Sequence, residues 1–194
     1  MKVENMKQFS LGSKQIGCNT EAFIIAEVGQ AHDGSLGAAY AYIDAIAETG
    51  ADAVKFQTHI ADAESTIDEP FRINFSKQDR NRYEYWKRME FKPDEWRGLA
   101  NYAKQKGLVF LSSPFSIEAV ALLEGLGIEA WKVGSGEISS FDLFDAIIKT
   151  NKPVLLSTGM SNYAEIGNSL DYLRRHDTAV ALFQCTSKYP VALE

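Results

Sequence analysis

Short hydrophobic runs alternate with helical patterns along most of this sequence. Two of these runs, Phe23–Val28 and Ala53–Gln57, have the length of buried strands and are bounded by glycine or polar residues. Runs of the same kind follow later in the chain, at Val109–Ser112, Ala130–Val133, Pro153–Ser157 and Ala179–Cys185. The hydrophobic pattern therefore predicts six buried strands.

Amphipathic patterns fill the intervals between these strands. They predict helices at Leu36–Gly50, Pro93–Gly107, Ile117–Gly127, Phe141–Thr150 and Tyr163–Arg175. The first helix has Ser35 as its N-cap and Gly50 as its stop signal. The strict alternation of strands and helices predicts a parallel sheet with right-handed crossovers. Such a sheet is either open and doubly wound or closed as a (β/α)8 barrel.

Polar residues at the ends of nearly all the strands favour the barrel. An open sheet gathers its functional residues at one switch point, whereas a barrel spreads them over many strand ends. We therefore expect an α/β fold of the (β/α)8 TIM-barrel class. Because a complete barrel takes about 250 residues, we expect residues 1–194 to be the N-terminal part of the domain, with about six of the eight strands.

The stretch at 58–92 departs from this rhythm. It is long and charged, and it contains the aromatic residues Tyr83, Tyr85 and Trp86. Long insertions in compact domains are usually functional lids or disordered segments, and the aromatic content argues against disorder. We therefore expect 58–92 to be a lid-like insertion. Its basic pairs are either solvated surface or groups that close over an anion.

The composition narrows the range of partners and compartments. The formal net charge of −6 argues against a nucleic-acid partner, because phosphate backbones select basic surfaces. Cys18 and Cys185 lack the number and spacing of a disulfide framework or a zinc motif, so we expect a cytoplasmic protein. No apolar run approaches the ~20 residues that span a bilayer, and the N-terminus lacks a signal-peptide core. We expect no membrane partner.

Two lysines lie inside otherwise apolar strands, Lys55 in AVKFQ and Lys132 in AWKVG. A buried ammonium group needs a partner, which is either a carboxylate such as Glu27 or Glu137, or an anionic ligand at the strand ends. The segment KVGSGE that begins at Lys132 adds glycines and a serine hydroxyl, which suit a phosphate or carboxylate group. STGM repeats this theme at the end of the next strand. These features together predict a site for a small anion.

The histidines and Cys185 leave alternatives open. His32 and His59 follow the first two predicted strands, and each is a base, a metal ligand or neither. His176 follows a predicted helix end beside two arginines and is expected on the surface. Cys185 is either a nucleophile or a structural cysteine, and the second is favoured because no histidine in the sequence is placed to activate it.

Several blocks of the sequence resemble one enzyme family. FIIAEVGQAHDGSLGAAYAYIDAIAETGADAVKFQTH resembles the opening of the sialic acid synthase family, and WKVGSGE, VLLSTGM and CTSKYP resemble its later blocks in the same order. The likeness extends over about residues 20–190. Members include N-acetylneuraminate, legionaminic acid and pseudaminic acid synthases and spore coat polysaccharide synthases.

The resemblance implies a TIM barrel, usually followed by a small antifreeze-like domain, in a homodimer. It implies condensation of phosphoenolpyruvate with an N-acetylated aminosugar such as N-acetylmannosamine, to give a nine-carbon 2-keto acid and phosphate. It implies a divalent metal, Mn²⁺ or Mg²⁺, held by family histidines that lie beyond Glu194. The implied catalytic residues are Glu27, Lys55 and Lys132, and the implied substrate contacts are Gln57, Ser113, Ser135, Ser157, Ser187 and Tyr189.

Phosphoenolpyruvate carries a phosphate and a carboxylate, so paired lysines with hydroxyl and backbone donors suit it. Two other hypotheses remain. One is an aldolase that forms a Schiff base on Lys132 or Lys55. The other is a non-catalytic or inactive partial barrel, whose open strand edges favour association. Because the metal ligands are expected elsewhere, we expect this chain alone to bind phosphoenolpyruvate weakly at best and not to turn it over.

Overall fold

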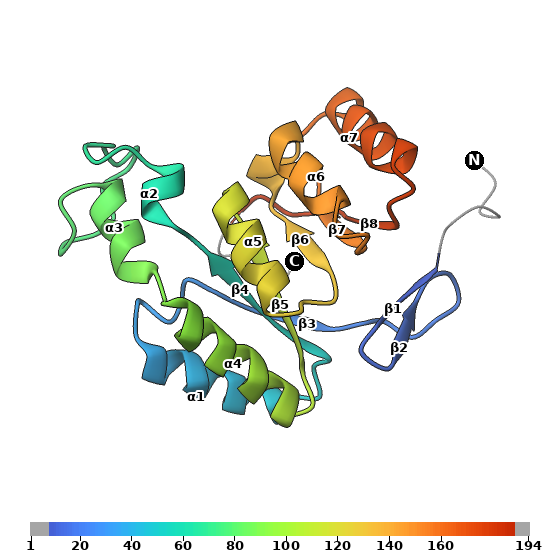
Figure 1. Cartoon of the computed structure of the whole chain (residues 1–194), viewed down its shortest axis with the longest axis horizontal. Helices are drawn as coiled ribbons and strands as arrows, with labels where there is room; N and C mark the ends of the chain where they lie inside the picture. The colour runs from blue at the N-terminus through green and yellow to red at the C-terminus, as the bar shows by residue number, and fades with distance from the viewer. Residues whose placement is uncertain (1–7, 189–194) are drawn as a thin grey trace.

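The computed structural model describes residues 8–188 and has an α/β fold (Figure 1). Its central feature is a set of parallel strands in chain order, β3 (Ile25–Gly29), β4 (Ala53–Thr58), β5 (Val109–Pro114), β6 (Trp131–Val133), β7 (Val154–Ser157) and β8 (Val180–Phe183). The hydrogen-bonded sheets are β3-β4-β5 and β6-β7-β8, and β5 lies beside β6. All six predicted strands are therefore confirmed, with ends that shift by one or two residues.

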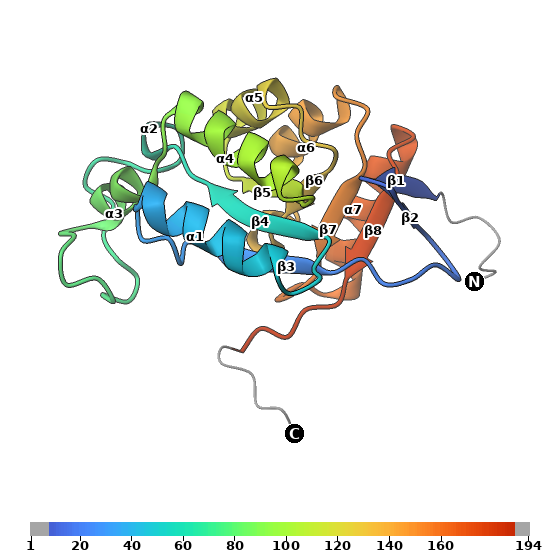
Figure 2. The ribbon, with the colours of Figure 1, turned by 90° about the horizontal axis from the view of Figure 1, so that it is seen from below.

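Helices cover the outer side of this curved array. They are α1 (Leu36–Ala47), α4 (Pro93–Gln105), α5 (Ile117–Gly125), α6 (Phe141–Ile148) and α7 (Tyr163–Arg175). Helices α1 and α4 lie side by side along β3–β5, and α5, α6 and α7 follow around the array (Figures 1 and 2). None of the helices within 8–188 is long and apolar enough to cross a membrane.

Consecutive strands are neighbours throughout the array. The reversal of strand order that defines a doubly wound sheet does not occur within residues 8–188, which favours the barrel over the open sheet. Over the same residues β3 and β8 do not pair, so the array is an open arc and not a closed barrel. The barrel prediction is thus supported in its topology, while closure is not observed in this chain.

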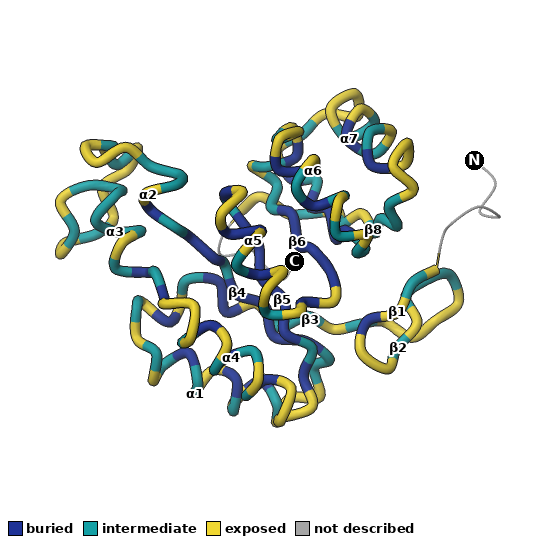
Figure 3. The backbone as a smooth tube through the Cα atoms, in the orientation of Figure 1, coloured by how far each residue is buried: buried dark blue, intermediate teal, exposed yellow. Residues whose placement is uncertain are grey.

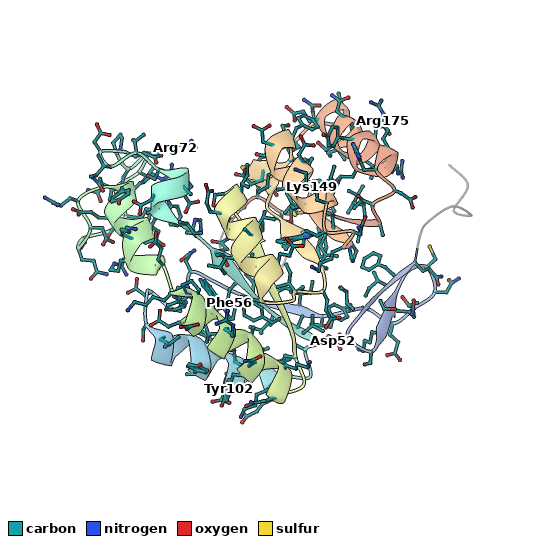
Figure 4. The ribbon with its side chains drawn as sticks, viewed as in Figure 1. Asp52, Phe56, Arg72, Tyr102, Lys149 and Arg175 are labelled. Atoms are coloured by element: carbon teal, nitrogen blue, oxygen red, sulfur yellow. The ribbon has the colours of Figure 1, made fainter. Side chains whose placement is uncertain are left out.

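The two faces of the strands have different partners. Outward side chains such as Val54, Phe56 and Phe110 pack against the helices in the larger hydrophobic core. Figure 4 shows Phe56 on β4 beside α4, and Figure 3 shows β4, β5 and β6 as the buried centre of the molecule. Inward side chains form a smaller core that includes Ala53 and Leu111. Because side chains alternate along a strand, this inner face continues toward the strand ends with Lys55, Gln57, Ser113, Lys132 and Ser157.

An N-terminal hairpin covers the opposite end of the inner face. It consists of β1 (Phe9–Leu11) and β2 (Lys14–Ile16), which pair in antiparallel fashion. Leu11 is only 1% exposed and packs into the smaller core. The hydrophobic pattern of the sequence does not predict this hairpin. Strands of three residues are too short for a readable alternation of polar and apolar positions.

The segment 58–92 contains two helices, α2 (Ala61–Glu64) and α3 (Arg82–Met89), and projects to one side of the barrel arc (Figure 1). The four basic side chains of its two basic pairs are bonded to carboxylates: Arg80 to Glu84, Arg82 to Glu69, Lys87 to Asp62, and Arg88 to Asp79 and Asp33. The basic groups therefore hold the segment together, and nothing in their pairing points to an anion. The lid role of the segment stays a prediction.

Candidate active site

Lys55 lies on the inner face of β4 and is 5% exposed. Its Nζ atom forms an ion pair with Glu27, which lies opposite it on β3. The same Nζ atom lies 3.5 Å from Oγ of Ser113 on β5. The prediction that Lys55 forms an ion pair with a carboxylate such as Glu27 is thus confirmed. Because the Glu27 side chain is 51% exposed, this pair opens toward solvent at the strand ends.

Lys132 has a different environment. It is 8% exposed on β6, and its Nζ atom donates to Oγ of Ser157 at 2.5 Å and to the carbonyl oxygen of Val133 at 3.0 Å. No carboxylate among the described residues forms an ion pair with it. Burial, together with the nearby charge of Lys55, lowers the pKa of Lys132 to about 8. Lys132 is therefore a buried cation with no direct carboxylate partner among residues 8–188.

A compact group of donors surrounds Gly159, just after β7. The backbone N–H of Gly159 donates to Oγ of Ser135 at 3.0 Å. A methyl group at Gly159 would lie 2.9 Å from Oγ of Ser135, 2.9 Å from Oγ of Ser187 and 3.1 Å from Cβ of Cys185. The segments that follow β6, β7 and β8 therefore converge at this glycine, where the close packing leaves no room for a side chain.

Of the predicted site residues, most lie together. The inner face groups Glu27, Lys55, Ser113, Lys132 and Ser157, with Ser135 and Ser187 beside Gly159. Gln57 lies opposite Ser113 in the strand register, on the same face. Tyr189 lies outside the described residues. Two ammonium groups close enough for one to lower the pKa of the other, with hydroxyl and amide donors around them, suit a ligand with two negative groups.

Cys185 lies beside this group and is half-buried. Burial raises the pKa of its thiol, but hydrogen bonds from Ser157, Thr158, Ser135 and Gly159 outweigh burial, so the pKa is lowered overall. The choice between a nucleophile and a structural cysteine stays open. The low thiol pKa reflects the same donors that favour a bound anion.

Two of the three histidines, His32 and His59, are buried. His32 is 1% exposed and packs against Phe91, and burial lowers its pKa to about 4. His59 is 5% exposed, stacks between Trp86 and Phe115, and contacts Glu64 through Nδ1 at 2.9 Å. His176 is exposed, as expected from the sequence.

Gly159 belongs to the STGM block, in which the sequence predicted part of the anion site. One further residue at the strand ends was not predicted. Gln30 follows Gly29 directly after β3, and both polar atoms of its side chain are buried. The rule that polar residues follow buried strands would have found Gln30.

The donor set does not fit a metal ion. Within residues 8–188, no three His, Cys, Asp or Glu side chains lie close enough together to hold one. In addition, Nδ1 of His32 accepts the backbone N–H of Gly34 at 3.1 Å, so its Nε2 carries the proton and cannot ligate. The divalent metal implied by the sequence resemblance stays a prediction.

A cavity of about 420 Å³ lies at the other end of the strands, lined by residues that include Lys14, Asp52 and Glu129. Three of its charged side chains are bonded within the protein: Lys14 with Asp52 at 2.7 Å, and Glu129 with the backbone N–H of Gly12 at 2.6 Å. The N-terminal end of barrel strands usually serves stability. We therefore assign the chemistry to the carboxyl ends of the strands, where Lys132 has no carboxylate partner among the described residues.

The fold and this group of side chains define a barrel-type α/β protein with a candidate anion site at the carboxyl ends of its strands. The chain belongs to the NeuB family, whose sequence model matches residues 42–194.

Among characterised relatives, N,N'-diacetyllegionaminic acid synthase of Campylobacter jejuni is 34% identical over 176 residues, which are 88% of this chain and 53% of that protein. Spore coat polysaccharide biosynthesis protein SpsE of Bacillus subtilis is 33% identical over 191 residues, 97% of this chain and 51% of that protein. The chain thus spans about half the length of these relatives.

Solved structures agree with this membership. The crystal structure of N-acetylneuraminic acid (sialic acid) synthetase from Leptospira borgpetersenii, in complex with citrate, has a TM-score of 0.82 and 28% identity, and covers 97% of this chain and 62% of that chain. A truncated 3-deoxy-D-arabino-heptulosonate 7-phosphate synthase from Thermotoga maritima has a TM-score of 0.65 at 15% identity, covering 92% of this chain and 56% of that chain. The second likeness concerns the TIM-barrel-type fold alone.

Proposed function

We propose that the protein to which this chain belongs condenses phosphoenolpyruvate with an N-acetylated aminosugar, giving a nine-carbon 2-keto acid and phosphate. One observation carries the proposal: Lys132 is a buried cation with no carboxylate partner among the described residues, and it lies at the strand ends with Lys55 and several hydroxyl groups. The family membership and the synthase names of the relatives support the same reaction.

Phosphoenolpyruvate has two negative groups, and the site offers two sets of donors. One set is Lys55 with Ser113, and the other is Lys132 with Ser157, Ser135 and the backbone N–H of Gly159. In the reaction, C3 of phosphoenolpyruvate forms a bond to the aldehyde carbon of the sugar, water adds at C2, and phosphate leaves. Fixing both substrates at the strand ends supplies much of the rate enhancement.

The sugar is assigned to the side of the site near Glu27 and Gln57. Glu27 is half-exposed and already bonded to Lys55, so its free carboxylate oxygen can accept a sugar hydroxyl. We assign Tyr189 to the same substrate on the sequence resemblance alone. A bound Mn²⁺ or Mg²⁺ would stabilise charge on the aldehyde oxygen. Cytoplasmic location, a homodimer and a lid at 58–92 remain predictions of the same account.

Phosphate release tests this function. The full-length gene product is incubated with phosphoenolpyruvate, Mn²⁺ or Mg²⁺, and a panel of N-acetylated aminosugars that includes N-acetylmannosamine. We expect phosphate only when both an aminosugar and the metal are present. No phosphate release with any sugar of the panel would refute the proposal. The 194-residue chain alone is expected to be inactive, so turnover by it would disprove our expectation that the metal ligands lie elsewhere.

The reduced pKa of Lys132 also favours a second candidate, an aldolase that forms a Schiff base on this lysine. An amine with a pKa of about 8 is partly unprotonated at neutral pH and can attack a carbonyl. Lys55, bound to Glu27, is a weaker candidate. Borohydride reduction in the presence of a keto substrate, followed by mass spectrometry, separates the two functions. An adduct on Lys132 supports the aldolase, and an unmodified lysine excludes it.

Binding of phosphoenolpyruvate is expected to weaken at alkaline pH. The ammonium form of Lys132 attracts the anion, and this form is lost as the pH rises through about 8. Between pH 7 and pH 9 we expect the affinity to fall about tenfold. At pH 9, one unit above the pKa of Lys132, only about a tenth of this lysine is still protonated. Isothermal titration calorimetry across this range measures the change. An affinity that stays constant would show that Lys132 does not contact the anion.

Phosphoenolpyruvate is also expected to protect Cys185 from alkylation. The thiol lies against Gly159 and shares hydrogen-bond donors with the site, so a bound anion covers it and competes for those donors. Saturating phosphoenolpyruvate should slow its reaction with iodoacetamide about tenfold. Cys18, which follows β2 near the other end of the strands, serves as an internal control whose rate should not change. Equal rates at Cys185 with and without the ligand would place the anion elsewhere.

A further inference from the structure

Four buried polar atoms lie after the ends of β3 and β4. They are Nε2 and Oε1 of Gln30, Nε2 of His32 and Nε2 of His59, and none has a hydrogen-bond partner among the described residues. An unsatisfied buried polar group costs about 1–3 kcal/mol. Several such atoms at neighbouring strand ends call for a physical explanation.

The hydrogen bond at Nδ1 of each histidine indicates whether that nitrogen carries a proton. Nδ1 of His32 accepts the backbone N–H of Gly34 at 3.1 Å, so this nitrogen is unprotonated and Nε2 is a donor. Nδ1 of His59 contacts both oxygens of Glu64, at 2.9 Å and 3.0 Å. A carboxylate only accepts, so Nδ1 of His59 carries a proton. In the neutral form of this ring, Nε2 is then an acceptor. In these forms the two buried Nε2 atoms are complementary, one a donor and the other an acceptor.

Both rings are held rigidly. His59 is stacked between Trp86 and Phe115, with ring centroids 3.8 Å and 4.2 Å away and interplanar angles of 11°. His32 lies 4.7 Å from Phe91 and 6.2 Å from Phe56 by ring centroids. Phe56 is paired with Gly29 across β3 and β4, which brings the two loops to the same end of the array. A positive charge on His59 would lower the pKa of His32, which agrees with this proximity.

We propose that Gln30, His32 and His59 form a buried binding site for one neutral hydroxyl group, which accepts from Nε2 of His32 and donates to Nε2 of His59. The Gln30 carboxamide supplies one further donor and one further acceptor. An anion is disfavoured by the lone pair of His59, and a cation by the N–H of His32. Only a group that both donates and accepts satisfies all three side chains.

Two sources of such a hydroxyl exist, an ordered water molecule and a substrate hydroxyl. Buried waters typically make about three hydrogen bonds to groups that are otherwise unsatisfied. In either case the bound hydroxyl joins the loop after β3, the strand of Glu27, to the loop after β4, the strand of Gln57. The site itself does not depend on the proposed condensation reaction.

Crystal structures of the chain with and without N-acetylmannosamine test the proposal. Water between the two Nε2 atoms in both crystals supports a structural water site. Replacement of that water by a sugar hydroxyl supports the site and assigns it to the substrate. A direct contact between the two Nε2 atoms, or protein atoms between them, would overturn the proposal. Long-range ¹H–¹⁵N spectra provide a second measurement, and protons on Nδ1 of His32 or Nε2 of neutral His59 would also overturn it.

A double-mutant cycle tests the coupling in solution. His32→Phe and His59→Phe keep an aromatic ring in each stack but remove the donor and the acceptor. If one hydroxyl bridges them, the two substitutions do not act independently. The double variant should then be more stable than the two single effects together predict, by about fivefold in the unfolding equilibrium constant. Strictly multiplicative effects would contradict the bridge. His176→Phe, on the exposed surface, serves as the control and should change the constant less than about twofold. If the variants fail to fold, the crystal structures decide alone.

Discussion

Replacing Lys132 with methionine is expected to weaken phosphoenolpyruvate binding about 100-fold, because a charged hydrogen bond in a buried site contributes about 1.5–3 kcal/mol. Lys132 has no carboxylate partner among the described residues, so the anion is its natural counter-charge. Methionine keeps the length and apolar stem of the side chain. Isothermal titration calorimetry of the wild type and K132M at pH 7 measures the loss.

The same substitution is expected to stabilise the chain in the absence of ligand. Burial and Lys55 lower the pKa of Lys132 from 10.5 to about 8, so folding disfavours the ammonium form. Below pH 8 the protonated lysine opposes folding fully, and between pH 8 and 10.5 this effect disappears as the folded protein loses the proton first. At pH 7 we expect K132M to be about 1–2 kcal/mol more stable, because lost hydrogen bonds to Ser157 and Val133 offset part of the gain.

Lys55→Met is the matched control for this prediction. Lys55 is equally buried but is paired with Glu27, so its replacement leaves a carboxylate without its partner and brings no gain in stability. Urea denaturation from pH 7 to pH 10 compares the two variants. A destabilised K132M, or an advantage that grows with pH, would show that Lys132 is not the unpaired cation we describe.

Gly34→Ala is expected to have the largest effect on stability, a loss of about 3 kcal/mol. Gly34 has φ = +78°, and a methyl group there would overlap the backbone carbonyl oxygen of Arg88. Arg88 also binds Asp33 at 2.6 Å and Asp79 at 2.7 Å, so displacement of α3 would disturb both ion pairs. The substitution therefore tests whether the segment 58–92 is docked firmly against the loop after β3.

Gly50→Ala separates backbone strain from this contact. Gly50 has φ = +79°, almost the same as Gly34, but a methyl group there meets no atom within 4 Å. We expect G50A to lose only about 1 kcal/mol, the cost of a left-handed conformation for alanine. Thermal unfolding of both variants measures the difference. Equal losses would mean that Gly34 does not touch Arg88 in solution.

The long elements were predictable because their periodicity is strong. The run Ala53–Gln57 alternates a helix-facing set, Val54 and Phe56, with an inner set that contains Lys55 and Gln57. Helix α7 at Tyr163–Arg175 was predicted with its exact bounds, because Asn162 and Glu165 form a capping box at its start. Such local signals survive in almost any tertiary context.

The short elements and the loop contacts were not predictable. The hairpin β1–β2 depends on Leu11 reaching the inner core, which is a long-range contact. The tautomers of His32 and His59 depend on Gly34 and Glu64, which pair with them only after the loops fold. The sequence alone predicted a carboxylate partner equally well for Lys55 and for Lys132. The strand register places Glu27 opposite Lys55, and Lys132 has no carboxylate partner among the described residues.

The central claim is that the carboxyl ends of the strands bind phosphoenolpyruvate, and titration of the ¹⁵N-labelled chain with this ligand tests it most directly. Chemical shifts detect weak binding, which is what we expect of this chain alone. We predict saturable shifts at the backbone N–H groups of Ser135, Ser157 and Gly159, with none in the hairpin Phe9–Ile16. Shifts confined to the hairpin end of the strands, or a spectrum unchanged at millimolar phosphoenolpyruvate, would contradict the account.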